Sequence, residues 1–388
     1  MTREGAERVV VLGCSGSIGT QAADVLERSE TMQCVGLAAG RDWKEAVAQA
    51  ERLGVDRIAI ADAESAAIAA GHFNGTVLAG PSGVLEIAIG SGADLVLNAI
   101  VGAAGLGSTL AALGEGIDVA LANKESLVVG GELVTGLAEA TGARLWPVDS
   151  EHSALQQLLG ATTPGEVHRI VVTASGGPFR EWGAADIAGA TVEQALAHPT
   201  WRMGGKITID SATMMNKGLE IIEAHHLFGI PMDRIDVLVH PQSIIHGLVT
   251  LADGAQLAHL GNPDMRVPIS WALHRGASTP LPTKKLDLAE IGQLTFEAPD
   301  EDRFPCLRLA REAQDRGGAA PCVLNAANEV AVYAFLDGKV PFGAIPEVVE
   351  TTLERDGDGA VHHASQLLEI DRKARETAGA VVDRLVAA

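Results

Sequence analysis

Residues 1–150 alternate short apolar runs with amphipathic, alanine-rich stretches, and this alternation limits the fold more than any other feature of the sequence. Strands that alternate with helical patterns at this pitch predict βαβ units and a parallel sheet. The expected strands are Arg8–Leu12, Cys34–Ala38, Arg57–Ile60, Leu95–Asn98, Val119–Ala122 and Arg144–Val148. We therefore expect an α/β fold whose N-terminal domain, residues 1–150, is a Rossmann-like parallel sheet.

The rest of the chain is more mixed and predicts an α+β catalytic domain at 151–275. The expected strands there are Ile170–Thr173, Ile207–Ile209, Ile235–Val239 and Ile244–Thr250. A helix starting near Ser211 is expected to separate the second and third of these runs. Residues 276–305 are rich in Pro and acidic residues, which is typical of a linker. The patterns that follow are helical only, so we expect a C-terminal helical domain at 306–388.

Charge and cysteine content restrict the partners and the compartment. Acidic residues outnumber basic ones, 50 to 29, which gives a formal net charge of -21. This charge argues against nucleic acid or an anionic membrane as a partner, because both need a basic surface, but it allows an anionic substrate in a locally basic site. No apolar stretch approaches the ~20 residues of a membrane span. The four cysteines form no CxxC pair, so we expect a reduced, cytoplasmic protein, or a mature form whose transit peptide has been removed.

A glycine-rich turn follows the first expected strand and precedes a helical stretch. Residues 13–19 read GCSGSIG, with GxxGxxG spacing instead of the commoner GxGxxG. Glycines permit a tight turn and close approach of the backbone to a pyrophosphate, and the helix N-terminus stabilises phosphate charge. Ser15 and Ser17 can add hydroxyl donors. The turn predicts a dinucleotide site, with a plain strand-to-helix turn as the alternative.

The end of the second expected strand bears on the choice between NAD and NADP. Enzymes that use NAD usually place an acidic residue there for the ribose hydroxyls. This chain has Gly40, Arg41 and Asp42. Arg41 is positioned to meet a 2′-phosphate, which favours NADPH, whereas Asp42 could instead serve an unphosphorylated ribose.

Two carboxylates follow the expected strand Arg144–Val148. In an extended segment positions i and i+2 face the same way, so Asp149 and Glu151 would project together at a carboxyl end, where α/β ligand sites lie. Close carboxylates repel each other unless they share a proton or a cation, and Mg²⁺ or Mn²⁺ is the natural partner. The alternative is the capped start of a helix.

A second polar cluster lies at 211–220, SATMMNKGLE. If Ser211 opens a helix, Asn216, Lys217 and Glu220 share one face, because residues three and four apart are neighbours on a helix. Asn, Lys and Ser side chains are good phosphate donors, and Glu220 could complete a metal site. A surface salt bridge is the alternative.

Two further segments carry candidate ligand-binding groups. Lys124 directly follows a buried-looking strand and would point into the same crevice, unless it is an ordinary exposed lysine. Residues 175–206 have adjacent glycines near both ends and Trp201 between them. Glycine-hinged loops with an apolar tip often close over substrates. We predict a mobile lid, with Trp201 as plain core packing in the alternative.

Taken together, these segments resemble the 1-deoxy-D-xylulose 5-phosphate reductoisomerase family. The matching segments are GCSGSIG, LANKESLV, PVDSEH, SGGPFRE, HPTWRMG, DSATMMNKGLE, HPQSIIHG, GNPDMRVPI and NAANEVAV. They run from residue 13 to residue 332 in the family's order and at its spacings. The resemblance implies an NADPH domain, a catalytic domain with a mobile loop and a C-terminal helical domain, usually as a homodimer.

The resemblance also implies cofactors and residue roles. It implies NADPH and a divalent ion, Mg²⁺ or Mn²⁺ with Co²⁺ as a further option, and it assigns the ion to Asp149, Glu151 and Glu220. The implied substrate-binding residues are Lys124, Ser150, Glu151, Ser175, His198, Trp201, Met203, Ser211, Asn216, Lys217 and Glu220. The implied cofactor-binding residues are Gly13, Ser15, Gly16, Ser17, Ile18, Gly40, Arg41, Asp42, Asn123, Glu125 and Gly204. Lys124 and Glu151 are the expected catalytic groups.

Two residues depart from the family's pattern. Family members often carry Asn where this chain has Asp42, and they often carry Ser where this chain has Arg202, between the lid's Trp and Met. Arg202 would either add a cation near the substrate or face solvent.

The expected reaction converts 1-deoxy-D-xylulose 5-phosphate to 2-C-methyl-D-erythritol 4-phosphate, the committed step of non-mevalonate isoprenoid biosynthesis. A metal that polarises the ketose carbonyl would assist carbon–carbon cleavage and re-formation, and NADPH would then deliver hydride. One alternative is an NAD(P)-dependent semialdehyde or hydroxy-acid dehydrogenase, but the pair of acidic residues, the third acid on a lysine-bearing helix and the lid argue against it, because simple hydride transfer needs no metal. The other is a non-enzymatic NADPH-binding regulator, which should lack the polar constellation of the second domain.

Overall fold

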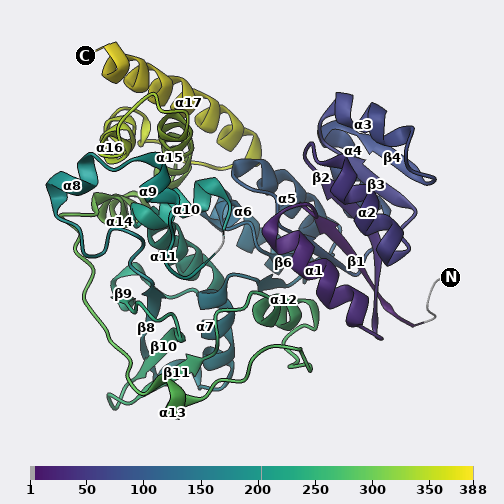
Figure 1. Ribbon diagram of the computed structural model, residues 1–388, viewed down its shortest axis with the longest axis horizontal. Coiled ribbons are helices and arrows are strands. Elements are labelled where there is room, and N and C mark those ends of the chain that lie inside the picture. Colours follow the sequence, from purple (N-terminus) through teal and green to yellow (C-terminus); the bar gives the residue numbers. More distant parts are fainter. Residues whose placement is uncertain (1–4, 202, 388) are drawn as a thin grey trace. The chain divides into compact units, whose positions relative to one another are not determined.

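The structure of the chain is a computed structural model that describes residues 5–201 and 203–387 (Figure 1). The described residues form two compact units. The first unit contains residues 5–126, 134–153 and 264–283. The second unit contains residues 127–133, 154–201, 203–263 and 284–387. Arg202, which the sequence predicts to lie in the lid, is outside the described residues.

The first unit is built on a seven-stranded parallel sheet with the order β4-β3-β2-β1-β5-β6-β7. Its strands are β1 (Glu7–Leu12), β2 (Met32–Ala39), β3 (Arg57–Ile60), β4 (Thr76–Ala79), β5 (Leu95–Asn98), β6 (Asp118–Leu121) and β7 (Leu145–Pro147). The order reverses between β1 and β5. In such sheets ligands bind outside the carboxyl ends of the strands at the point of reversal. The predicted Rossmann-like parallel sheet is confirmed.

Amphipathic helices cover this sheet. They are α1 (Ser17–Arg28), α2 (Trp43–Leu53), α3 (Ala63–Ala70), α4 (Gly80–Gly90), α5 (Leu106–Gly114) and α12 (Arg266–Leu273). Alanines one turn apart, Ala46 and Ala50 of α2, are fully buried in the same core as β1 and β2. Small side chains at this spacing let a helix pack closely on a sheet, which explains a core rich in Ala and Val. Two helices contain residues of both units, α6 (Glu125–Thr141) and α7 (Ser150–Gly160).

The second unit contains a four-stranded sheet with the order β11-β10-β8-β9. Its strands are β8 (Val167–Ala174), β9 (Ile235–Val239), β10 (Ile245–Leu251) and β11 (Gln256–Leu260). Strand β8 is parallel to β9 and antiparallel to β10, which is also antiparallel to β11. The helices of this unit are α8 (Ala184–Ala188), α9 (Val192–Leu196), α10 (Gly205–Ala212), α11 (Met215–Phe228), α13 (Leu288–Ile291), α14 (Pro305–Arg316), α15 (Ala320–Leu336), α16 (Ala344–Asp356) and α17 (Ala364–Ala387).

The C-terminal region is helical, as predicted, and its helices α15, α16 and α17 pack on one another (Figure 1). Buried side chains of α14–α17 belong to the same hydrophobic core as α11 and strands β8 and β9. The helices that follow residue 304 and the sheet of the second unit are therefore stabilised together.

The structure corrects several local expectations. Ile207–Ile209, expected as a strand, lies inside helix α10, because a short Ile-Thr-Ile run does not distinguish a strand from one turn of helix. The helix expected to open at Ser211 is two helices, since Met214 at φ 62° separates α10 from α11. Strands β4 and β11 were not expected at all; the ends of β4 are exposed and no residue of β11 is fully buried, so both give little apolar signal. Within residues 5–201 and 203–387, no helix has the length and hydrophobicity that a bilayer span requires.

Candidate active site

The glycine-rich turn joins β1 to the N-terminus of α1. Gly13 has a φ of 79°, and a Cβ atom there would lie 2.4 Å from the carbonyl oxygen of Ala99. A Cβ atom at Gly19 would lie 2.4 Å from the carbonyl oxygen of Gly13. Both contacts are too short for any side chain, so this turn needs glycine at both positions. Gly16 is the N-cap residue of α1, and with Ser17 it is exposed, beside the half-buried Ser15 and Ile18. The turn thus presents a helix N-terminus with hydroxyl donors at the carboxyl end of β1.

Arg41 and Asp42 follow the end of β2 and differ in how they are held. The Arg41 side chain is 86% exposed, and its nearest carboxylate oxygen is that of Asp62 at 3.5 Å. Asp42 is the N-cap of α2, where its side chain accepts a hydrogen bond from the Glu45 backbone N–H at 3.2 Å. Asp42, the acidic residue that made the choice between NAD and NADP uncertain, therefore has a local structural role as the cap of α2.

Asn123 lies in the loop after β6, and Glu125, on the other side of Lys124, is the first residue of α6. Asn123 Nδ2 donates to the carbonyls of Ile100 and Gly102 and to Glu125 Oε2, at 2.7, 2.9 and 2.9 Å. Asn123 Oδ1 accepts from the backbone N–H of Ser126. These bonds tie the loop after β5 to the loop after β6, so both predicted cofactor residues here are buried and held in place.

Lys124, Asp149 and Glu151 lie together in the first unit. Lys124 Nζ donates to Asp149 Oδ2 at 2.7 Å, and a carboxylate oxygen of Asp149 lies within 4.8 Å of one of Glu151. The prediction that Asp149 and Glu151 lie in an extended segment is wrong. Asp149 precedes α7, Glu151 is in the first turn of that helix, and its backbone N–H points to Asp149 Oδ1 at 3.4 Å. The helical turn still brings the two carboxylates close, and Ser150 Oγ donates to Glu151 Oε2 at 2.5 Å.

Ser175 and His198 are hydrogen-bonded in the second unit. His198 Nδ1 accepts from the backbone N–H groups of Thr200 and Trp201, at 3.2 and 2.9 Å. An acceptor nitrogen carries no proton, so the neutral ring has its proton on Nε2 and donates it to Ser175 Oγ at 3.0 Å. Burial lowers the pKa of His198, which agrees with a neutral ring. Ser175 Oγ also accepts from Gly177 N–H, so its own hydroxyl proton is available to a further acceptor.

Asn216, Lys217 and Glu220 share one face of α11, as predicted. Asn216 Nδ2 donates to Glu220 Oε1 at 2.5 Å, and Lys217 Nζ donates to Glu220 Oε2. Lys217 and Glu220 are both buried, so the surface salt bridge considered from sequence is excluded. Ser211 belongs to the preceding helix, and a Cβ atom on Gly177 would lie 2.7 Å from its carbonyl oxygen. The loop that carries Ser175 therefore approaches α10 closely.

The predicted lid segment is anchored at its start. Phe179 is fully buried and packs edge-on against Phe342, with ring centroids 5.1 Å apart. Trp201 and Met203 at the other end are half-buried. Gly204 is the exposed N-cap of α10 and belongs to the second unit, unlike the other predicted cofactor residues.

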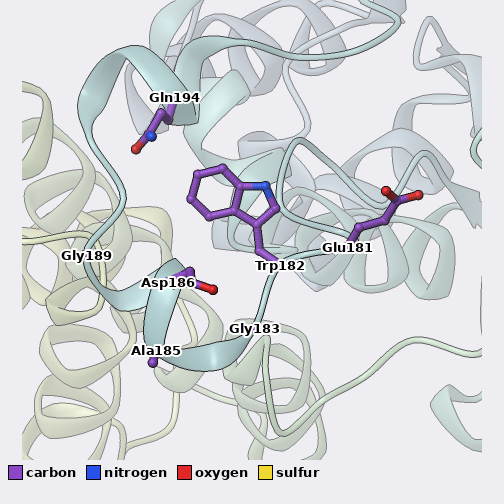
Figure 2. Close-up of a pocket in the computed structure, with 7 residues that line it drawn as sticks. All are labelled: Glu181, Trp182, Gly183, Ala185, Asp186, Gly189 and Gln194. Atoms are coloured by element: carbon purple, nitrogen blue, oxygen red, sulfur yellow. The ribbon is translucent and has the colours of Figure 1, made fainter.

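An open pocket lies along the middle of this segment, around α8 and α9. It is lined by Glu181, Trp182, Gly183, Ala185, Asp186, Gly189 and Gln194. Figure 2 shows the Trp182 indole beside Gln194, with the Glu181 carboxylate pointing away from the ring. The lining contains none of the predicted substrate or cofactor residues.

Sequence reasoning missed two buried polar residues next to the candidate groups. His152 is fully buried, with Nδ1 3.5 Å from Asp149 Oδ1, and its spacing of three from Asp149 was a usable signal. Asp210 is buried beside Ser211 and accepts from Asn328 Nδ2 at 2.8 Å. No local pattern links residues so far apart in the chain.

Family models match most of the chain in three segments. Residues 9–131 match the model described as 1-deoxy-D-xylulose 5-phosphate reductoisomerase. Residues 145–228 match the model of a 1-deoxy-D-xylulose 5-phosphate reductoisomerase C-terminal domain. Residues 260–377 match that of a DXP reductoisomerase C-terminal domain.

Whole-chain comparisons agree with these models. A 1-deoxy-D-xylulose 5-phosphate reductoisomerase of Symbiobacterium thermophilum is 48% identical over 378 residues, which cover 95% of this chain and 97% of the relative. The Zymomonas mobilis enzyme, solved in complex with NADPH, is 44% identical, with a TM-score of 0.89 over 97% of this chain and 99% of that one. A DOX-P reductoisomerase solved with NADPH, fosmidomycin and magnesium is 38% identical, with a TM-score of 0.91 over 97% and 98%. The chain therefore belongs to the 1-deoxy-D-xylulose 5-phosphate reductoisomerase family.

Proposed function

We propose that this chain isomerises and reduces 1-deoxy-D-xylulose 5-phosphate to 2-C-methyl-D-erythritol 4-phosphate, with NADPH and a divalent metal ion, in non-mevalonate isoprenoid biosynthesis. One observation carries the proposal: Lys124, Asp149 and Glu151 meet at the carboxyl ends of strands in the same unit as the glycine-rich turn. Simple hydride transfer needs a nucleotide site but no carboxylate pair. Rearrangement of a carbon skeleton before hydride transfer is assisted by a metal ion, which the carboxylate pair would bind.

The donor set fits a hard divalent cation. Asp149 and Glu151 offer carboxylate oxygens within 4.8 Å of each other, and Mg²⁺ and Mn²⁺ prefer such oxygens. We propose that Glu220 of the second unit is the third carboxylate ligand. Its bonds to Asn216 and Lys217 would orient it, as partners of metal ligands commonly do. Mg²⁺ or Mn²⁺ is the proposed ion, with Co²⁺ as a further option.

NADPH is the proposed cofactor because the groups after β2 suit a 2′-phosphate. Arg41 is exposed enough to take a second anionic partner, whereas the Asp42 carboxylate is engaged as the cap of α2. Gly13, Gly16 and the hydroxyls of Ser15 and Ser17 would hold the pyrophosphate at the α1 N-terminus. The remaining proposed contacts are Ile18, Gly40, Asn123, Glu125 and Gly204.

The substrate phosphate is proposed to bind in the second unit. Ser175 presents a hydroxyl donor that His198 fixes in orientation. Ser211, Asn216 and Lys217 would add donors, and a phosphate held there supplies binding energy remote from the reacting carbons. Trp201 and Met203 would close over the substrate and exclude water.

The bound metal would supply Lewis acidity at the ketose oxygens, and NADPH would supply hydride. This chain's own residues would position the substrate and move protons at its oxygens. The Lys124 ammonium would stabilise negative charge that develops on substrate oxygen, while Ser150 holds Glu151 through a hydrogen bond. Glu151 would assist proton movement at those oxygens.

A homodimer in the cytoplasm is the proposed state. The dimer rests on the resemblance to the family. The compartment rests on Cys14, Cys34, Cys306 and Cys322, all buried thiols. Burial raises the pKa of Cys306 to about 12, so this thiol is unreactive.

An NAD(P)-dependent semialdehyde or hydroxy-acid dehydrogenase is the other function that the nucleotide turn alone would allow. Family membership over the whole chain argues against it. The assay that separates the two mixes the purified chain, NADPH and 1-deoxy-D-xylulose 5-phosphate, with Mn²⁺ or with EDTA, and follows the nicotinamide absorbance. Loss of absorbance only with metal, and much slower with NADH, supports the proposal. Undiminished loss in EDTA contradicts the metal requirement, and no loss under any metal contradicts the activity.

A further inference from the structure

We propose that Asp210 is a positioning residue that holds α10, and with it Ser211, in the geometry that binds the substrate phosphate, and that Asn328 of the C-terminal helices sets its position. The inference rests on the proposed function for the identity of the ligand. Both oxygens of the Asp210 carboxylate are held. Oδ1 accepts from Asn328 Nδ2 at 2.8 Å, and Oδ2 lies 3.0 Å from Lys206 Nζ.

All three side chains are buried, which makes their arrangement specific. Asp210 is 1% exposed, Asn328 0% and Lys206 6%. A buried carboxylate is tolerated only when charge and hydrogen bonds compensate for lost water. An ionised carboxylate accepts hydrogen bonds and donates none, so Asn328 must turn its NH₂ group toward it. Shifting α10 relative to α15 would break this bond and leave a charged oxygen without its donor.

The helix that carries Ser211 needs an anchor of its own. Helix α10 is short, and Met214 in the left-handed region separates it from α11. Helix α11 is fixed separately by its close approach to α14, where a Cβ atom on Gly218 would lie 2.6 Å from Ala310 Cβ. The spacing between Ser211 and the donors of α11 is therefore not set by one continuous helix. The Asp210–Asn328 bond supplies an attachment to a different helix.

Helix α15 is also bonded to α17, by contacts that do not involve Asp210. Next to Asn328 on α15, Glu329 pairs with Arg375 of α17 at 2.8 Å. Asn325, one turn earlier on α15, donates to Glu329 Oε1 at 3.0 Å. Helix α15 thus bonds to α17 through Glu329 and to α10 through Asn328. The segment NAANEVAV would thus help to place a phosphate ligand that none of its residues is proposed to bind.

The test compares Asn328→Leu with Asn325→Leu. Both asparagines are fully buried on α15, and each has an Oδ1 atom without a hydrogen-bond partner among the described residues. Only Asn328 bonds to Asp210, so the two substitutions match in burial and chemistry and differ in the bond to α10. Two properties are measured for each variant with NADPH and Mn²⁺ present: the affinity for inorganic phosphate by calorimetry, and amide hydrogen exchange in residues 205–212 and 215–228.

We expect Asn328→Leu to weaken phosphate binding by roughly tenfold and to speed exchange in α10 by a similar factor, the usual consequence of losing one bond to a buried charge. Exchange in α11 and the affinity for NADPH should stay as in the wild type, and Asn325→Leu should change neither phosphate affinity nor α10 exchange. Equal effects of the two variants on α10 and on phosphate would overturn the inference.

A second pair of variants covers the case in which Asn328→Leu does not fold. Both are made in a Lys206→Met background, so that they do not differ in the ion pair between Lys206 and Asp210. Asn328→Asp places two carboxylates against each other and should loosen α10, whereas Asp210→Asn combined with Asn328→Asp restores one amide facing one carboxylate. Recovery of slow α10 exchange in the double variant supports the inference, and failure to recover it contradicts it. Exchange does not depend on turnover. A chain that is inactive on 1-deoxy-D-xylulose 5-phosphate would therefore refute the proposed function alone.

Discussion

Lys124 and Asp149 form a largely buried ion pair, with Nζ and Oδ2 2.7 Å apart and side chains 7% and 14% exposed. They follow β6 and β7, which are neighbours in the sheet, so the parallel arrangement brings the two loop ends together. Burying either charge without the other would cost several kcal/mol. The proposed metal ion would therefore share Asp149 with an ammonium group that already neutralises it.

Replacing Lys124 should separate metal binding from catalysis. In Lys124→Met the ammonium no longer competes for Asp149, so Mn²⁺ should bind at least as tightly as in the wild type. Turnover should fall on the order of 100-fold, because the cation that stabilises charge on the substrate is gone. Metal titration and steady-state rates measure the two effects. Lys44→Met, at an exposed position on α2, is the control. Weaker metal binding together with unchanged turnover would rule out this role.

Glu220 and Glu223 provide a test of the metal ligands, because both are buried carboxylates on α11. Glu220→Gln should weaken Mn²⁺ binding and turnover on the order of 100-fold, the scale expected when a metal site loses an essential partner, and should leave NADPH affinity unchanged. Glu223→Gln should retain metal affinity. The assignment fails if Glu223→Gln loses the metal and Glu220→Gln keeps it.

The choice between NADPH and NADH should depend on Arg41 and not on Asp42. Arg41→Ala should raise KM for NADPH by roughly tenfold or more, because a charge-assisted bond to the 2′-phosphate is lost, and should leave KM for NADH unchanged. Asp42→Asn keeps an oxygen that can cap α2 and should not change the preference. An improved NADPH preference in Asp42→Asn would show that the acid acts on the ribose after all.

His246 should make the fold less stable in acid. Burial, with a smaller effect of His259, lowers the pKa of His246 to about 4 from its ordinary value of 6.5. As the pH falls, His246 is protonated in the unfolded chain before it is protonated in the folded chain. The resulting loss of unfolding free energy is absent above about pH 6.5 and complete below about pH 4. Near pH 5 it amounts to about 2 kcal/mol of lost unfolding free energy.

Urea unfolding of the wild type and of His246→Gln, at about pH 7.5 and about pH 5, measures this contribution. The variant should lose less stability between the two conditions than the wild type, by about 2 kcal/mol. The prediction is wrong if the two proteins lose the same amount.

The sequence was sufficient to predict features that depend on residues close together along the chain or on a regular sequence pattern. The turn at residues 13–19 was predictable from glycines spaced between a strand and a helix, and Gly19 meets the backbone of Gly13 and Cys14 only a few residues away. The shared face of Asn216, Lys217 and Glu220 follows from helical periodicity alone. The Rossmann-like sheet was predictable because its strands alternate with helices at a regular pitch.

Features that depend on the folded conformation of the backbone, or on distant partners, were not predictable in this way. The sequence left Asp42 as a possible ligand of an unphosphorylated ribose, and its role as the cap of α2 is seen only in its bond from Glu45 N–H. Asp149 and Glu151 are close for a different reason than expected, since a helical turn and not an extended strand brings them together. The bond between Asp210 and Asn328 joins residues 118 positions apart, and nothing in either local sequence indicates the other.

The carbon skeleton of the product tests the central claim most directly. The chain would be incubated with NADPH, Mn²⁺ and ¹³C-labelled 1-deoxy-D-xylulose 5-phosphate, and the product examined by NMR. The proposed reaction predicts a branched product, 2-C-methyl-D-erythritol 4-phosphate, in which a carbon–carbon bond has moved and one NADPH has been consumed for each molecule formed. An unbranched, merely reduced pentitol phosphate would contradict it and identify the chain as a simple dehydrogenase.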